Sequence, residues 1–320
     1  MANPNVGQRV AANWELVVKT KPEDQIHNDY WLFNNLSTGD GFVGKSGGDF
    51  ITTPVEYALN TTVASYSDLD PISTTRVDTF DRYEAQWKEV AGVYAISDLE
   101  ADRNAGEGQV FDLRAAKLEN LRNSIKYNLN TMLFSDGTGN SSKDLMGLQG
   151  LVATSASSGS CQGVSRVTYS WARNQQTSGA QTTSAYDNLR AAMRSIYNLS
   201  SNGISSDHPS FGVTTRTVFE AFEGLLIANE RFTAKGRGEG AFQTLTFKGA
   251  ELSFDVACPS AILYFLNPKF LKLVYKTGSW MKAQPAIRPV NQTGDFIVIR
   301  TMANLFTTNP RRLGCVTGIS

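Results

Sequence analysis

The stretch from residue 110 to residue 134 constrains the fold of this chain more than any other. Its apolar side chains recur mostly every three or four residues, and neither proline nor glycine interrupts the run. Such spacing is typical of an amphipathic helix, and Ser135, Asp136 and Gly137 supply the stop. About 24 residues at 1.5 Å each give roughly 36 Å, so we expect a helix that spans a whole subunit. The apolar positions are Val110, Leu113, Leu118, Leu121, Ile125, Leu129 and Met132.

Two strand-like stretches precede this helix. Residues 51–63 place apolar side chains on alternate positions among several threonines, and residues 83–95 resume the alternation around Trp87. A polar segment lies between them. We interpret residues 49–100 as a long hairpin-like excursion. A ribbon of two strands is marginal in water, so we expect this excursion to need an external partner.

The first 48 residues are rich in Asn, Asp and Gly, and their apolar groups are too scattered to sustain one period. We interpret this segment as an extended arm. Trp14 and Trp31 lie in it. Large aromatic side chains in an arm need a surface to bury against, and a neighbouring chain would provide one.

The rest of the chain separates helices from strands. Residues 154–183 are rich in Ser, Thr, Gly and Gln and indicate a loop or weak strands anchored by Trp171. Two helices follow, with capping boxes predicted at Ser184 with Asp187 and at Thr217 with Glu220. Strands are then expected over 245–254, 261–266, 271–275 and 296–301. The fold class is therefore α+β.

Charge and cysteine content narrow the function classes. Thirty basic and thirty acidic residues cancel, which argues against a protein that holds nucleic acid through a basic surface and permits self-association. Charged residues make up only 19% of the 320, below the usual quarter. Three widely spaced cysteines indicate neither a zinc cage nor a disulfide framework, and a reducing compartment fits best. We expect neither a classical secretion signal nor a membrane span.

One phosphate-loop match needs an explanation. Gly39, Gly44, Lys45 and Ser46 satisfy the pattern GxxxxGK[ST]. A phosphate loop also needs a buried strand before it and a helix after it, whereas the following sequence, GGDFITTPVEY, favours no helix. We therefore expect a flexible turn here, and keep a P-loop nucleotide hydrolase as the less favoured alternative.

The other motifs lack the context of a site. The GxSxG match at residues 44–48 has no fitting histidine, since His27 lies upstream and His208 sits in a loop-like SSDHPS. An EF-hand beginning at Asp98 fails at its glycine and glutamate positions, so Asp98, Glu100 and Asp102 are expected near the N-terminus of the long helix or in solvent. The KGRGEG segment predicts a mobile loop. We predict no catalytic residue, metal ligand or cofactor.

The order of these elements resembles the major capsid protein of tailed bacteriophages, with the Hong Kong 97-type fold. The resemblance covers about residues 45 to 320 and depends on order and spacing. It rests on PVEYALNTTVASYSDLD (54–70), YEAQWKEVAGVYAIS (83–97), ADRNAGEGQVFDLRAAKLENLRNSI (101–125), FSDGTG (134–139), GLQGL (147–151), FKGAELSFD (247–255), YFLNPKFLKL (264–273) and TTNPRRLG (307–314).

The resemblance implies a non-enzymatic shell subunit that forms pentamers and hexamers, encloses double-stranded DNA without reading its sequence, and assembles in the host cytoplasm into a virion capsid. Scaffold, portal and decoration proteins would be its partners. An encapsulin-like cellular nanocompartment stays open as the alternative. The implied divisions are an N-terminal arm (1–48), an E-loop hairpin (49–100), a peripheral domain with the spine helix (101–180), an axial domain (181–266) and return strands (267–320). We predict contacts between subunits at Trp14, Trp31, Tyr66, Asp70, Arg76, Arg82, Trp87, Lys235 and Arg237.

Overall fold

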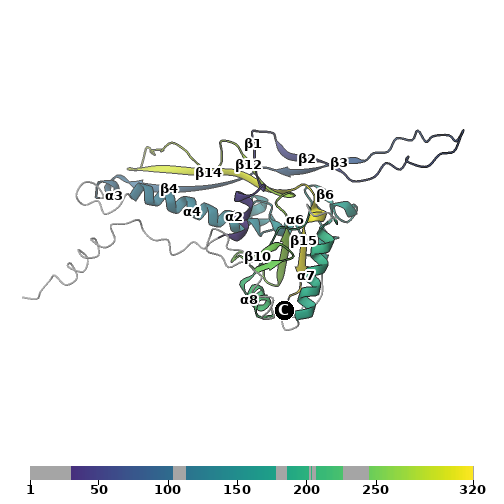
Figure 1. The fold of residues 1–320 in the computed structure, drawn as a ribbon. Helices are drawn as coiled ribbons and strands as arrows, with labels where there is room; N and C mark the ends of the chain where they lie inside the picture. The colour runs from purple at the N-terminus through teal and green to yellow at the C-terminus, as the bar shows by residue number, and fades with distance from the viewer. Residues whose placement is uncertain are drawn as a thin grey trace, which may run out of the picture.

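The computed structural model describes residues 30–103, 113–177, 186–201, 203, 207–225 and 245–319. Two parts extend from a central body in opposite directions. One contains α4 (Leu113–Leu133) with β4 (Lys88–Ser97) and β14 (Gly294–Thr307), and the other is a thin two-stranded ribbon (Figure 1). The helices are α2 (Trp31–Thr38), α3 (Asp98–Arg103), α4 (Leu113–Leu133), α5 (Gly139–Ser142), α6 (Leu148–Leu151), α7 (Tyr186–Ser200) and α8 (Arg216–Leu225), with 3₁₀ turns at Ser170–Ala172 and Pro310–Arg312.

The predicted long helix is α4, and the prediction is confirmed over the residues that are described. Leu113–Leu133 at 1.5 Å per residue span roughly 31 Å. The helix ends where the sequence indicated, before Gly137, which adopts a positive φ of 80°. Val110 lies outside the described residues. Ile125, Leu129 and Leu133 are buried and face the core.

One sheet forms the part of the subunit that carries the long helix α4. Its order is β1–β12–β14, with β13 and β4 also paired to β14, and α4 packs along β4. β14 is the longest strand, and its antiparallel pairing with β4 runs from Gly294 opposite Ser97 to Ala303 opposite Lys88. The bounds are β1 (Phe42–Lys45), β4 (Lys88–Ser97), β12 (Leu271–Lys276), β13 (Lys282–Ala283) and β14 (Gly294–Thr307).

A second sheet forms the other part of the body, covered by α7 and α8. Its six strands run in the order β7–β15–β11–β8–β10–β9. All five residues of β11 are buried, as expected for a central strand. The bounds are β7 (Gln175–Thr177), β8 (Phe211–Thr214), β9 (Leu245–Phe247), β10 (Ala250–Phe254), β11 (Ile262–Leu266) and β15 (Gly314–Thr317), while β5 (Ser160–Cys161) and β6 (Val164–Ser165) pair with each other.

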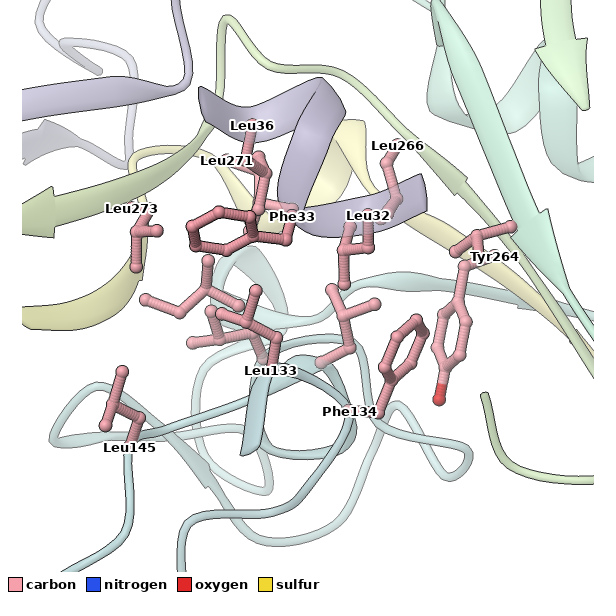
Figure 2. Close-up of a cluster of buried hydrophobic side chains, with 14 of the residues drawn as sticks. Leu32, Phe33, Leu36, Leu133, Phe134, Leu145, Tyr264, Leu266, Leu271 and Leu273 are labelled. Atoms are coloured by element: carbon pink, nitrogen blue, oxygen red, sulfur yellow. The ribbon is translucent and has the colours of Figure 1, made fainter. Parts of the chain in front are cut away.

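Residues 31–45 do not form a free extended arm, because residues 31–38 are helix α2 and residues 42–45 are a strand of the main sheet, so the predicted arm is wrong over this part. Leu32, Phe33 and Leu36 of α2 insert between the end of α4 and the strands β11 and β12, as Figure 2 shows. β1 then pairs in parallel with β12. Burial of these side chains stabilises a helix too short to form alone. Residues 1–29 lie outside the described residues.

A carboxylate from the second sheet holds α2 in place. Asp255 Oδ2 accepts a hydrogen bond from the Leu32 amide (3.4 Å) in the first turn of α2. Asp255 Oδ1 accepts one from Asn130 Nδ2 of α4 (2.9 Å). Asp255 is buried, and this burial raises the pKa of its carboxyl although the hydrogen bonds oppose the shift. One side chain thus connects α2, α4 and the end of β10.

Three smaller predictions need correction. The strand expected over 83–95 is two strands with different partners, since β3 ends at Gln86 and β4 begins at Lys88. Helix α8 begins at Arg216, so Thr217 lies inside its first turn and is not its N-cap. The strands predicted over 261–266, 271–275 and 296–301 are confirmed, whereas the stretch 245–254 is a hairpin of two strands, β9 and β10, rather than one strand. Ser184 lies outside the described residues.

Candidate assembly interface

The ribbon is formed by β2 (Phe50–Glu56) and β3 (Phe80–Gln86), paired antiparallel from Phe50 opposite Gln86 to Glu56 opposite Phe80. Beyond Glu56 the chain continues outward without strands and returns at residue 79. The predicted strand is therefore wrong beyond Glu56. Two hydrogen bonds close the paired part: the Tyr57 amide donates to the Thr79 carbonyl (3.0 Å), and Tyr57 Oη donates to the Asp78 carbonyl (2.9 Å).

The outer ribbon, residues 57–79, is shaped by its own polar groups. Asn60 Oδ1 accepts a hydrogen bond from the Thr62 amide (3.0 Å), and Tyr66 Oη donates to the Thr62 carbonyl (3.0 Å). Asp70 Oδ2 accepts from the Ser67 amide (2.7 Å). These local bonds give the outer ribbon a shape without a hydrophobic core beneath it.

Apolar side chains on the outer ribbon point into solvent. Leu59 is 86% exposed, Leu69 97% and Ile72 71%. Single exposed apolar residues are common on protein surfaces, but several on one thin projection mark a surface that another molecule covers.

The base of the ribbon is fixed to the body by aromatic side chains. Trp171 packs against Tyr57 (ring centroids 5.4 Å apart), Tyr83 (5.5 Å) and Tyr169 (5.8 Å). Trp87 Nε1 donates a hydrogen bond to the Gly48 carbonyl (2.8 Å). The prediction that Trp171 anchors the segment 154–183 is confirmed, and its contacts with Tyr57 and Tyr83, which were not predicted, also fix the base of the ribbon.

A cleft of about 840 Å³ lies beside this base, between β3, the turn after α4 and the β5–β6 pair. Asp81, Glu84, Asp136 and Asp144 line it, together with two basic side chains. Lys88 Nζ donates a hydrogen bond to the Ser142 carbonyl across one wall.

The predicted contact residues fall into three groups. Trp31 is only 8% exposed and donates from Nε1 to the Gly212 carbonyl (3.3 Å), so its assignment to an interface is wrong: it fills the core of its own chain. Trp87 is half-buried at the ribbon base, and its contact with a neighbour stays a prediction. The contacts predicted for the exposed Tyr66, Asp70, Arg76 and Arg82 also stay predictions, while Trp14, Lys235 and Arg237 lie outside the described residues.

The phosphate-loop alternative is wrong. Gly44 and Lys45 lie in strand β1, and the next element after Ser46 is strand β2 rather than a helix. No helix amide can therefore face a phosphate at this position. The expected flexible turn is wrong over residues 42–45, because β1 belongs to the main sheet, while residues 46–49 connect β1 to β2 without a helix or strand. The GxSxG match lacks a helix for the same reason.

The other polar residues that the sequence singled out, His208, Asp98 and Glu100, have partners within the fold. His208 Nδ1 lies 2.6 Å from Ser201 Oγ, and the ring stacks on Tyr197. Asp98 and Glu100 begin α3 rather than the long helix, and Glu100 forms an ion pair with Lys117 of α4 (2.7 Å). Among the described residues, no three His, Cys, Asp or Glu side chains are grouped to hold a metal ion, and no helix is long and apolar enough to cross a membrane.

The three thiols are buried and unpaired. Burial raises the pKa of Cys161 to about 11 and that of Cys315 to about 12. The guanidinium of Arg166 opposes the shift at both cysteines. Thiols in such surroundings are inert rather than nucleophilic.

Comparison with solved structures identifies the fold. The chain is similar to a subunit of the cyanophage A-1(L) capsid (TM-score 0.70, 13% identity, 94% of this chain and 96% of the other). It is similar also to the capsid of Myoviridae phage XM1 (0.61, 12%, 96% and 98%) and to the SrpI encapsulin of Synechococcus elongatus PCC 7942 (0.64, 13%, 100% and 97%). Neither a protein-family model nor a curated protein matches the sequence. The predicted Hong Kong 97-type α+β fold is confirmed.

Proposed function

We propose that this chain is the major capsid protein of a tailed double-stranded DNA phage. Copies of it assemble into pentamers and hexamers of an icosahedral shell and bury surface between neighbours. The shell encloses DNA without sequence-specific contacts, in line with a formal net charge of zero. The subunit is structural and uses no cofactor. It assembles in the host cytoplasm and resides in the virion, with scaffold, portal and decoration proteins as partners.

One observation carries this proposal: the outer ribbon places bulky apolar side chains in solvent far from any core of its own chain. Exposing them costs free energy at about 25 cal/mol per Å² of apolar surface, and a neighbouring copy removes that cost. The anchoring of the ribbon by Trp171 supports the proposal, because a projection with a fixed direction can meet the same surface on every neighbour.

Electron microscopy of the purified chain tests the proposal. We expect closed shells, capsomers or sheets from the wild type, and loss of these from the variant Leu59→Asp. Leu59 is almost fully exposed, so the variant subunit keeps the wild-type circular dichroism and melting temperature. Leu59→Met, which keeps an apolar side chain, is the matched control and retains assembly. A wild type that stays monomeric under all assembly conditions overturns the proposal.

Particle contents separate phage from nanocompartment. The fold is shared with an encapsulin, so we expect the distinction to appear in the cargo of particles isolated from the native source. Packaged double-stranded DNA supports the phage capsid. A packaged enzyme with no DNA supports the nanocompartment instead.

A further inference from the structure

Strand β4 is an edge strand. Its ten residues pair with β14 on one side, and within the described residues no strand pairs with its other side. α4 covers one face of β4, where Val90 and Ile96 are buried, but it does not add a strand to the edge. The backbone groups along that edge therefore have no neighbouring strand among the described residues.

Two reciprocal hydrogen bonds define which backbone groups point outward. The Phe296 amide donates to the Ile287 carbonyl (2.9 Å) and the Ile287 amide to the Phe296 carbonyl (2.8 Å), so Phe296 of β14 faces away from β4. Ala95 lies opposite Phe296 in the antiparallel pair, so the N–H and C=O groups of Ala95 also point away from β14, toward the open edge. Lys117 Nζ reaches the Ala95 carbonyl from that side (3.3 Å). By alternation, Val93, Ala91 and Glu89 face the same way.

Among the described residues beyond Glu89, the only charged group that reaches a backbone group of this edge is Lys117, at the Ala95 carbonyl, so the edge has little of the usual protection against strand addition. Natural edge strands carry charges, prolines or bulges, whereas residues 90–97 of β4 contain neither charge nor proline. The side chains of its outward-facing residues are exposed too, and Val93 is 54% exposed. Within the described part of the chain, no backbone partner meets the amides of Val93, Ala91 and Glu89. The edge is an open template for one more strand.

The returning limb of the outer ribbon fits this template. Residues 71–79 contain no helix, strand or turn. The Ser73 amide faces its own ribbon, donating to Tyr66 Oη (3.4 Å), so in an extended chain the amides of Ile72 and Thr74 face outward. The ribbon and β4 leave the body on opposite sides (Figure 1), so one chain cannot pair its own ribbon with its own β4. A ribbon that adds to this edge must therefore belong to a second copy.

We propose that residues 72–76 of one copy add as an antiparallel strand to the outer edge of β4 in a neighbouring copy. Ile72 lies opposite Val93, Thr74 opposite Ala91 and Arg76 opposite Glu89. This inference rests on the proposed function and specifies the contact through which neighbours associate.

The proposed register also places compatible side chains opposite each other. It pairs two exposed apolar residues, Ile72 and Val93, and it brings the exposed Arg76 beside Glu89, whose carboxylate already accepts from Arg300 Nε (2.8 Å). Pro71 falls opposite Tyr94, whose backbone groups face β14, so the missing proline amide leaves no donor unpaired. A heterologous contact of this kind repeats from copy to copy, and the pentamers and hexamers of the proposed shell are rings of such contacts.

Disulfide trapping tests the register. Ile72→Cys and Val93→Cys are made as separate variants and mixed before assembly, so that only a contact between copies can link them. Residues directly opposite in a hydrogen-bonded antiparallel pair have Cα atoms about 5.5 Å apart, within the range for a disulfide. The native cysteines are buried and do not compete. We expect a disulfide-linked dimer from the mixture and none from either variant alone.

The matched control is Thr75→Cys mixed with Val93→Cys. Residue 75 lies on the opposite side of the added strand, so this mixture gives no dimer. Particles that assemble normally without the 72–93 link, or with an equal 75–93 link, overturn the inference and leave the proposed function standing. A wild type that forms no assembly overturns both.

Hydrogen exchange provides a second readout that needs no variant. The amides of Glu89, Ala91 and Val93 exchange more slowly in assembled wild-type particles than in dissociated subunits, because the added strand accepts their hydrogen bonds. Equal exchange in the two states contradicts strand addition.

Discussion

Replacing Leu36 by alanine distinguishes a packed α2 from an extended arm. Leu36 is fully buried between α4 and the main sheet. The substitution removes three carbons, a transfer cost of about 2.4 kcal/mol at 0.8 kcal/mol each. The cavity left behind adds to this, and buried leucines replaced by alanine cost about 2–5 kcal/mol in total. We therefore expect the free energy of unfolding of the isolated subunit to fall by about 3 kcal/mol.

Urea unfolding followed by near-ultraviolet circular dichroism measures this difference. The midpoint should fall while the slope stays unchanged, because the same surface is exposed on unfolding. Leu59→Ala is the matched control: its side chain contacts solvent, so its effect should stay within about 0.5 kcal/mol. If Leu36→Ala behaves like Leu59→Ala, residues 31–38 do not pack as a core helix and the reasoning is refuted.

Three further predictions concern the interior. With a pKa of about 11, Cys161 is about one-thousandth thiolate at pH 8, so we expect iodoacetamide to label the buried thiols only when urea opens the fold; labelling of the native subunit by mass spectrometry would contradict this. The raised pKa of Asp255 means that its stabilising contribution is full below its ordinary value of about 3.9 and is lost as the pH rises through the folded value. Relative to Asp255→Asn, the wild type should therefore lose stability in thermal melts as the pH is raised from acid to neutral, and a constant difference between them argues against it. A Cβ at Gly92 would lie 2.7 Å from a leucine methyl of α4, so Gly92→Val should cost about 1–3 kcal/mol in urea, while Ala91→Val on the exposed side should stay near zero; equal effects would exclude close packing of α4 on β4.

The long helix could be predicted from local pattern alone because its period, length and glycine stop all lie within one segment. Helix α2 could not. Its four buried side chains, Trp31, Leu32, Phe33 and Leu36, are too few to establish a period. The group that holds its first turn is Asp255, which lies 223 positions away in the chain. A helix whose burial and cap both come from tertiary contacts leaves no local signal.

In the ribbon, too, the local pattern predicted the type of structure, while contacts distant in the sequence decided the pairing. Alternation indicated β character on both sides of Trp87, but a period of two does not say which strand is the partner. The change of partner at this residue, from β2 to β14, is decided by the C-terminal part of the chain. Exposure of the outer ribbon was foreseen from its isolation, whereas the open edge of β4 could be recognised only from the register of β14.

The low share of charged residues is explained by where the uncharged stretches lie. Residues 57–67 of the outer ribbon and residues 90–97 of β4 contain no charged side chain, although both are surfaces of the subunit. A soluble protein that works alone keeps charges on such edges, because an uncharged edge pairs with other chains. Here the two stretches lie on opposite sides of the body. In the head-to-tail contact that we propose, each would meet a different neighbour. A chain selected to stay monomeric would place lysines at these positions, and introducing lysine at Val93 should therefore abolish assembly while leaving the subunit folded.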